Sequence, residues 1–187
     1  VGLAAVFSSK AADIIGVVYP DAYRIGGLAL RFLAWGVAGL SFLLIACTIL
    51  NSAGKTRRAI FTVGATLVLS TALNVVLLYT ADNQGEALSR AGLATAVAMV
   101  AGALVSGVVV LKTFGALISP LSAVRLLGAA GGTFLAGWWL ASGGVLVTVA
   151  QCAGLVLVYG GVLVVTRELG GEDLGKVLKM LGGGPSK

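Results

Sequence analysis

Four polar residues lie within or beside long apolar stretches of the chain, where a polar side chain is costly in hydrocarbon. The amide groups of Asn74 and Gln151 suit the hydroxyls of a sugar, and the guanidinium of Arg31 suits a phosphate. Asp13 is the carboxylate expected at membrane depth, so it is the candidate for ion coupling; Lys10 lies three residues earlier and can pair with it. These residues predict a polar cavity for a hydrophilic or anionic substrate. Hydrogen bonds between helices for Asn74 and Gln151, and an interfacial position for Arg31, are the alternative.

The sequence lacks the residues that most enzymes need. It has no histidine, and no two of its seven acids share a buried helix face. Cys47 and Cys152 lie inside apolar stretches, so neither a disulfide framework nor a Cys/His metal site is expected. Trp138, Trp139 and Tyr159 could stack on a sugar, but the two tryptophans near a span end fit the interfacial aromatic belt better. We therefore expect no enzyme, no metal and no cofactor.

Composition and charge spacing indicate a polytopic helical membrane protein. Of the 187 residues, 58% are hydrophobic and 11% are charged, whereas about 25% are charged in soluble domains. The uncharged stretches 32–54, 59–81, 91–111 and 126–166 are 23, 23, 21 and 41 residues long. About 20 apolar residues span a bilayer as a helix, so the last stretch holds two spans. The expected fold class is an all-α transmembrane bundle of about five full spans after one partial N-terminal span. The full spans are 27–50, 59–80, 91–111, 121–142 and 145–166.

The expected organisation has three parts. Residues 1–25 are the end of a preceding span and an outer loop, 26–166 form the five-span bundle, and 167–187 form a tail with a short amphipathic helix at 172–181. Because the chain starts at Val1 within an apolar segment, we expect it to be part of a longer protein that is cut at its N-terminus.

Lysine and arginine are distributed unevenly between the two sets of connections. One set holds nine of them and the opposite set holds three, so the positive-inside rule places the first set in the cytoplasm. The nine are Lys55, Arg57, Arg58, Lys112, Arg125, Arg167, Lys176, Lys179 and Lys187. The three are Arg24, Arg31 and Arg90. The C-terminus is therefore expected in the cytoplasm. This topology also explains the net charge of +6, so nucleic acid is not expected as a partner.

Small residues recur four positions apart in two of the expected spans. Gly102 and Ser106 form one pair, and Gly128 and Gly132 form another. Membrane helices associate through close backbone packing at such residues. The spans are therefore expected to pack as a bundle rather than to act as independent anchors.

Short motifs mark the ends of several expected spans. They are, in order, Tyr19-Pro20-Asp21-Ala22-Tyr23, Leu50-Asn51-Ser52-Ala53-Gly54-Lys55, Asn74-Val75-Val76-Leu77-Leu78, Ala91-Gly92-Leu93-Ala94-Thr95-Ala96 and Arg167-Glu168-Leu169-Gly170-Gly171-Glu172-Asp173-Leu174. This set resembles the C-terminal half of the lipid-linked polysaccharide flippases, in the multidrug/oligosaccharidyl-lipid/polysaccharide exporter superfamily. Pro20 and Asp21 depart from the Tyr-Gly-x-x-Tyr-like loop of that family.

The resemblance implies that the chain is the C-terminal lobe of a larger transporter with two lobes around a central cavity. Such transporters flip undecaprenyl-diphosphate-linked oligosaccharide across the bacterial inner membrane for polysaccharide biosynthesis. The implied partners are the lipid-linked oligosaccharide, membrane lipids and the missing N-terminal lobe. Two alternatives remain open. One is a drug or metabolite antiporter of the same superfamily, with Asp13 as its ion-coupling residue. The other is a small non-enzymatic membrane scaffold or accessory subunit.

Overall fold

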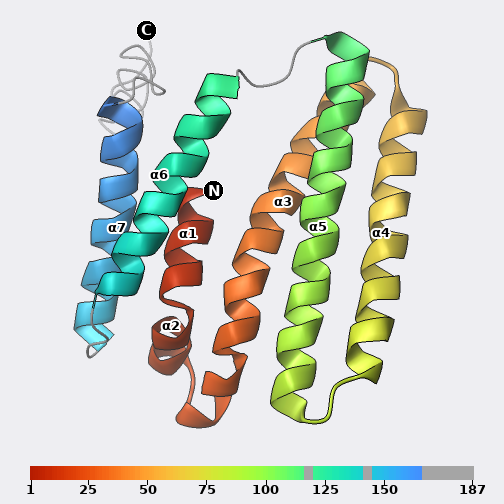
Figure 1. Ribbon diagram of the computed structural model, residues 1–187. Coiled ribbons are helices and arrows are strands. Elements are labelled where there is room, and N and C mark those ends of the chain that lie inside the picture. Colours follow the sequence, from red (N-terminus) through yellow and green to blue (C-terminus); the bar gives the residue numbers. More distant parts are fainter. Residues whose placement is uncertain (116–119, 141–144, 166–187) are drawn as a thin grey trace, which may run out of the picture.

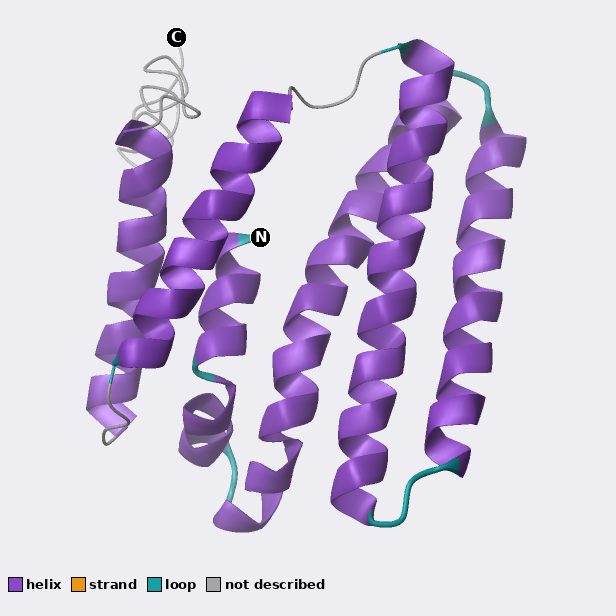
Figure 2. Cartoon of the chain, viewed as in Figure 1, coloured by secondary structure: helices purple, strands orange, loops and turns teal. Residues whose placement is uncertain are grey.

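The computed structural model describes residues 1–115, 120–140 and 145–165, and every regular element in these ranges is helical (Figure 1, Figure 2). The helices are α1 (Gly2–Ser9), α2 (Ala11–Val18), α3 (Gly27–Ser52), α4 (Thr56–Tyr79), α5 (Gln84–Phe114), α6 (Pro120–Trp139) and α7 (Val145–Val165). A 3-10 helix, η1 (Asp21–Gly26), joins α2 to α3. The expected all-α fold class is confirmed for these residues. The amphipathic helix predicted at 172–181 lies outside them.

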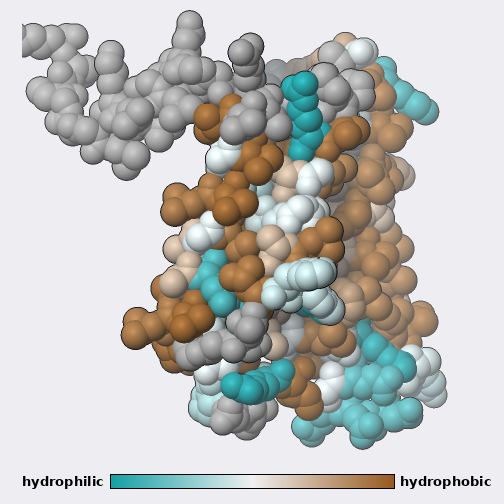
Figure 3. All heavy atoms as spheres, turned by 60° about the vertical axis from the view of Figure 1, so that its left-hand side comes forward, coloured by the Kyte–Doolittle hydropathy of each residue, from teal (hydrophilic) through white to brown (hydrophobic). Residues whose placement is uncertain are grey.

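Four helical segments are long and apolar enough to cross a membrane. They are Tyr23–Ser52, Thr56–Tyr79, Gln84–Phe114 and Val145–Val164. The predicted count of five is not confirmed, because α6 is not among them. Arg125, four glycines and two tryptophans lower the hydropathy of this 20-residue helix. In Figure 3, apolar side chains cover much of the middle of the face shown, and hydrophilic ones gather mainly at its lower end. Both observations are compatible with a membrane protein.

The α3–α5 contact is the most extensive helix pair in the described chain, and small residues let the two backbones approach closely. A Cβ atom at Gly36 of α3 would lie 2.9 Å from the Cα of Ala96. A Cβ atom at Gly92 of α5 would lie 3.0 Å from the Cα of Ala29. Any side chain at these glycines would collide with backbone rather than with a flexible side chain. This is the packing expected of helices that associate in a membrane.

The two small-residue pairs predicted from sequence have different outcomes. Gly102 and Ser106 are both buried, and Gly102 lies directly against Thr66 of α4, so this pair is a packing site. Gly128 and Gly132 are exposed, and a Cβ atom at either would meet nothing within 4 Å, so that prediction is wrong within the described chain. A spacing of four residues places two residues on the same helix face, but it does not say which neighbour that face meets.

An apolar cluster joins α3, α4 and α5 near the end where α3 stops and α4 begins. Its buried members are Leu43, Ala46, Cys47, Leu50, Ala59 and Val110. The turn between α3 and α4 reverses the chain within a few residues, and Gly54 has a φ of 71° there. This left-handed conformation favours glycine because it has no Cβ atom. The cluster fixes the ends of three helices relative to one another.

The two short helices α1 and α2 lie between the α3–α5 group and the α6–α7 pair (Figure 1). The backbone of α1 approaches α3, α6 and α7, and that of α2 approaches α3 and α7. Among the described residues, the backbones of α6 and α7 lie close to those of α1 and α2 but not to those of α3, α4 or α5. The span end expected just before residue 19 corresponds to α2. Residues 2–9, however, form a separate helix that is also part of the bundle.

Candidate functional site

The helical path of the N-terminal segment is broken at Lys10, between α1 and α2. Lys10 has φ and ψ of −113° and 20°, outside the helical range of its neighbours. Its backbone N–H donates to the carbonyl of Val6 at 3.2 Å, and its own carbonyl accepts from the N–H of Ile14 at 2.9 Å. The Oγ of Ser9 donates to the same carbonyl of Val6 at 2.9 Å. Serine hydroxyls that bond back to the preceding turn often accompany helix bends.

The break places the ammonium group of Lys10 inside the bundle. Its side chain is only 3% exposed, and its Nζ lies 3.5 Å from an Oδ atom of Asp13, which is 22% exposed. The same Nζ donates a hydrogen bond to the carbonyl of Leu140 at 2.7 Å. Leu140 directly follows the last residue of α6, where carbonyl groups lack partners within the helix and a cation is favourable. Lys10 therefore connects the break to the end of α6.

Arg31 of α3 reaches the same region from the opposite side. Its Nε donates to the carbonyl of Ser8 at 3.2 Å. Its guanidinium carbon lies 4.5 Å from the ring centre of Trp138 and 5.5 Å from that of Phe134, both on α6. These distances are within the range of cation–π contacts. Trp35, one turn after Arg31, donates from Nε1 to the Oγ of Ser8 at 3.0 Å.

Lys10, Asp13 and Arg31 are hereafter called the charged cluster. Ser8 and Lys10 are neighbours on the N-terminal segment, and their bonds extend to α3 and α6 respectively. Two cations and one anion leave the cluster with an excess of one positive charge. Within the part of the chain that the structure describes, neither Nη atom of Arg31 forms a hydrogen bond. The arrangement can therefore offer the guanidinium edge of Arg31 to an anion, whereas the buried ammonium of Lys10 is already engaged by Asp13 and Leu140.

Of the other predicted site residues, Asn74 is not brought to the charged cluster. It lies on α4, on the far side of α3 and α5 from α1 and α2. Its Nδ2 donates to the carbonyl of Ser70 at 2.9 Å and to the Oγ1 of Thr95 on α5 at 3.3 Å. This is the bond between helices that the sequence left open as the alternative role.

Gln151 lies half-buried on α7, the helix that packs against α1, α2 and α6. The Oγ1 of Thr148, one turn earlier, is buried and forms no hydrogen bond with any described residue. Asp13 and Arg31 thus share one region, Gln151 belongs to an adjoining helix, and Asn74 lies apart. Whether any of them contacts a substrate stays a prediction.

Sequence reasoning paired Lys10 with Asp13 but did not include Lys10, Ser8 or Trp35 among the site residues. The pairing is confirmed by the 3.5 Å contact. The signal for Lys10 was its charge within an otherwise apolar segment. No signal pointed to Ser8 or Trp35, because small hydroxyls and single tryptophans are common in membrane spans. Trp138, for which the sequence favoured the interfacial belt over sugar stacking, is 59% exposed and also stacks on Arg31.

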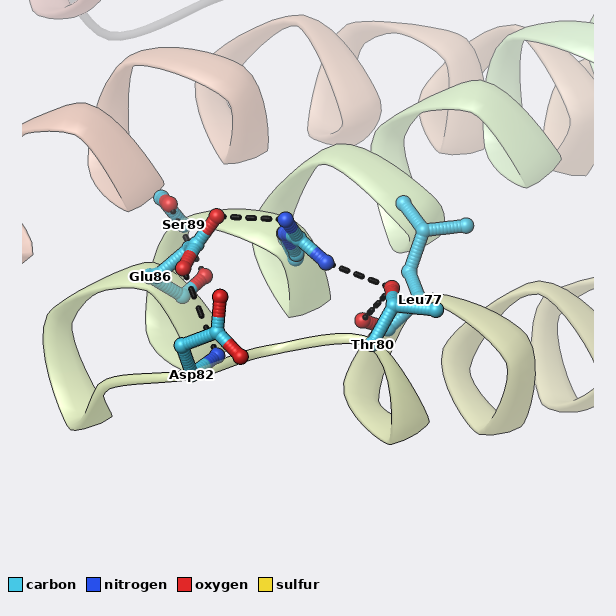
Figure 4. A network of polar contacts seen from close by, with 6 residues as sticks. Leu77, Thr80, Asp82, Glu86 and Ser89 are labelled. Carbon is cyan, nitrogen blue, oxygen red and sulfur yellow. Dashed lines mark hydrogen bonds and ion pairs between the residues drawn. The ribbon is translucent and has the colours of Figure 1, made fainter.

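A second polar network closes the α4–α5 turn (Figure 4). Arg90 pairs with Glu86 one helical turn away and also donates to the Oγ1 of Thr80. The Oε2 of Glu86 accepts from the backbone N–H of Asp82 at 3.3 Å. Arg90 and Glu86 are 29% and 37% exposed, so this pair contributes little to stability. We interpret the network as a structural closure of the turn.

No group of three or more histidine, cysteine, aspartate or glutamate residues occurs among the described residues in an arrangement that could hold a metal. The groups that the structure brings together at the charged cluster are an ion pair, hydrogen-bonding hydroxyl and carbonyl groups, and aromatic rings. In comparisons with protein-family models, curated proteins and solved structures, nothing matches this chain.

Proposed function

We propose that the chain forms one lobe of a membrane transporter that flips an undecaprenyl-diphosphate-linked oligosaccharide across the bacterial inner membrane. The observation that carries the proposal is the charged cluster, with Lys10 only 3% exposed at a helix break. Ionisable groups inside membrane segments are costly and typically mark pathways for substrates or ions. Transporters also commonly build their binding sites from interrupted helices.

The chemistry of the cluster suits a diphosphate joined to a sugar. Arg31 can offer its Nη atoms as a pair of donors to phosphate oxygens, and Lys10 supplies a second cation. The exposed ring of Trp138 and the ring of Phe134 lie against the Arg31 guanidinium, where a sugar face could stack. The excess positive charge of the cluster favours an anionic headgroup over a neutral one.

The arrangement of the helices also supports a two-part transport mechanism. The α3–α5 group and the α6–α7 pair are joined through α1, α2 and the stacking of Arg31 on α6, so the cluster lies at the junction of two units. In α4 and in α7, only 11% of the apolar 18-residue segment that could lie in the membrane is buried. Both helices therefore keep broad apolar faces for lipid or for a second lobe. The uneven Lys and Arg counts favour a cytoplasmic C-terminus.

The test is a flipping assay in proteoliposomes that contain the protein purified from its own membrane. The probe is a fluorescent polyprenyl-diphosphate disaccharide, and its inner-leaflet fraction is read from protection against a membrane-impermeant quencher. We expect Arg31→Gln to slow flipping about tenfold or more, because a charge-assisted hydrogen bond contributes about 1.5–3 kcal/mol. The control is Arg90→Gln, which alters a cation in the α4–α5 turn.

Two outcomes would count against the proposal. Unchanged flipping in Arg31→Gln and Lys10→Gln would remove the role of the charged cluster. Absence of flipping by the unaltered protein, with lipid uptake no faster than in empty liposomes, would favour the scaffold alternative. An equal loss in Arg90→Gln would point to a general effect on folding rather than on the cluster.

One observation favours the antiporter alternative. The Asp13 carboxylate is 22% exposed and its ion pair with Lys10 is 3.5 Å long, so a proton or cation could compete with Lys10 for it. The substitution Asp13→Asn should then abolish efflux driven by a proton gradient. Efflux that survives Asp13→Asn would exclude Asp13 as the coupling residue.

A further inference from the structure

A basic hollow lies at the opposite end of the α4–α5 pair from the polar turn of Figure 4. It has a volume of about 530 Å³. Its lining combines three cations with apolar and hydroxyl side chains: Arg57, Arg58, Phe61, Thr62, Val109 and Lys112. The cations come from the first turn of α4 and the last turn of α5. Uncharged sequence begins at residue 59, so the hollow lies where the apolar part of α4 starts.

The positive charge of this hollow is not neutralised within the described part of the chain. None of its three cations forms an ion pair with a described residue, unlike Lys10 and Arg90, which pair with Asp13 and Glu86. Arg58 is instead held by a hydrogen bond from its Nη1 to the Oγ1 of Thr113 at 2.6 Å. The four described acids lie toward the other end of the bundle, on α2, η1, the α4–α5 turn and the start of α5.

An apolar groove continues from this hollow along α4. It has a volume of about 560 Å³ and shares Phe61 with the basic hollow. Its other lining residues follow one stripe of the helix: Gly64, Ala65, Val68, Leu69 and Ala72. From residue 61 to residue 72 the stripe is about 16 Å long, at about 1.5 Å per residue. That length is close to half of the ~30 Å hydrocarbon core, which is the depth of one leaflet.

We infer that the hollow and the groove together bind one anionic phospholipid, with its phosphate among Arg57, Arg58 and Lys112 and an acyl chain along the α4 groove. Charge complementarity selects an anionic headgroup, and the continuity of the two spaces at Phe61 selects an amphiphile. The depth of one leaflet selects a phospholipid over a much longer polyprenyl chain. Basic pockets between membrane helices are known to hold anionic headgroups in this way. The inference requires membrane embedding and does not depend on transport.

The test places a fluorophore at the junction of the two spaces. Phe61→Trp in the full chain, reconstituted in phosphatidylcholine bilayers, is quenched with brominated phosphatidylglycerol or brominated phosphatidylcholine. The signal of the unaltered protein is subtracted, because its three tryptophans lie on α3 and α6. We expect phosphatidylglycerol to bind at least about fivefold more strongly, since each nearby basic residue contributes about 1 kcal/mol to attraction of an anionic lipid. Native mass spectrometry of the protein with Phe61 intact should show the same preference in retained lipid.

Substitutions then separate the hollow from the general surface charge. The double variant Arg57→Gln/Lys112→Gln should lose the preference, whereas Lys55→Gln should keep it. Lys55 is the matched control because it is exposed, precedes α4 directly and does not line the hollow. Equal quenching by the two lipids would overturn the inference. Absence of quenching by either lipid would overturn it as well, because the groove would then be covered by protein. An equal loss with Lys55→Gln would overturn it too, because the attraction would then be diffuse.

Discussion

The ion pair between Lys10 and Asp13 allows a double-substitution cycle that tests whether the charged cluster holds the bundle together. Lys10→Met removes the cation, which leaves the Asp13 carboxylate unpaired and the Leu140 carbonyl without its donor. Asp13→Asn keeps the shape of the side chain and removes its charge, which leaves a buried ammonium without a counter-ion. The double variant carries neither charge.

The structure sets the size of each effect. Removing one member of a fully buried ion pair costs about 3–5 kcal/mol. Because Asp13 is 22% exposed, water weakens this effect, and we expect each single substitution to lower the free energy of unfolding by about 2–3 kcal/mol. The double variant loses mainly the Lys10–Leu140 hydrogen bond, so we expect a loss of about 2 kcal/mol. The coupling energy, which is the sum of the two single losses minus the double loss, is therefore expected to be about 2–4 kcal/mol.

The assay is equilibrium unfolding of the full chain in mixed micelles by a denaturing detergent, followed by far-ultraviolet circular dichroism. The matched control is a second cycle, Glu86→Gln and Arg90→Gln, on the ion pair of the α4–α5 turn. Both partners of that pair are about a third exposed, so its coupling should stay below about 0.5 kcal/mol. Effects of Lys10→Met and Asp13→Asn that add to within about 0.5 kcal/mol would refute the reasoning.

Three further predictions concern contacts between helices, each measured by the same unfolding assay. Gly36→Ala should destabilise the chain by about 1–2 kcal/mol, because its new Cβ lies 2.9 Å from the α5 backbone; Gly64→Ala meets nothing within 4 Å and should be neutral or slightly stabilising. Asn74→Leu should cost less than about 1 kcal/mol, since hydrogen bonds between membrane helices average about 0.6 kcal/mol, and a larger loss would contradict the minor role of its 3.3 Å bond. Trp138→Leu should lower the free energy of unfolding by about 1 kcal/mol, because the stacking on Arg31 is lost. An unchanged free energy of unfolding would mean that this contact does not stabilise the chain.

The positions of the long helices could be predicted largely from charge spacing. The expected spans starting at residues 27 and 145 begin where α3 and α7 begin, and the segment expected to end at residue 18 ends with α2. Charge spacing locates these spans, but the three ends themselves follow from turn residues in the sequence, Pro20 after the first segment and Gly143-Gly144 before residue 145. α5 begins at Gln84 rather than at residue 91, because the turn network of Glu86 and Arg90 extends the helix into the polar region.

The rotation of each helix about its axis could not be predicted in the same way. Gly128 and Gly132 have the same spacing as Gly102 and Ser106, yet the first pair is exposed and the second is buried. The difference depends on which neighbour each helix meets, and that is decided by contacts between segments far apart in sequence. The stacking of Arg31 on α6 likewise joins residues about a hundred positions apart, so no local pattern could predict it.

The contacts that hold the bundle together are of two kinds. Substitutions at the charged residues can therefore test the role of the charges without changing the close backbone packing. α3 and α5 are joined by close backbone packing at glycines. The N-terminal segment, α3 and α6 are joined also by the bonds of Lys10, by the bond from Arg31 to Ser8 and by the stacking of Arg31 on α6. If the ion pair is purely structural, removing both of its charges should cost less than the two single losses together, and the double variant should still flip lipid. If Lys10 instead binds a diphosphate, the Lys10→Met/Asp13→Asn protein should fold and still fail to flip lipid. Folding and flipping measured on that one variant thus separate a structural pair from a binding site.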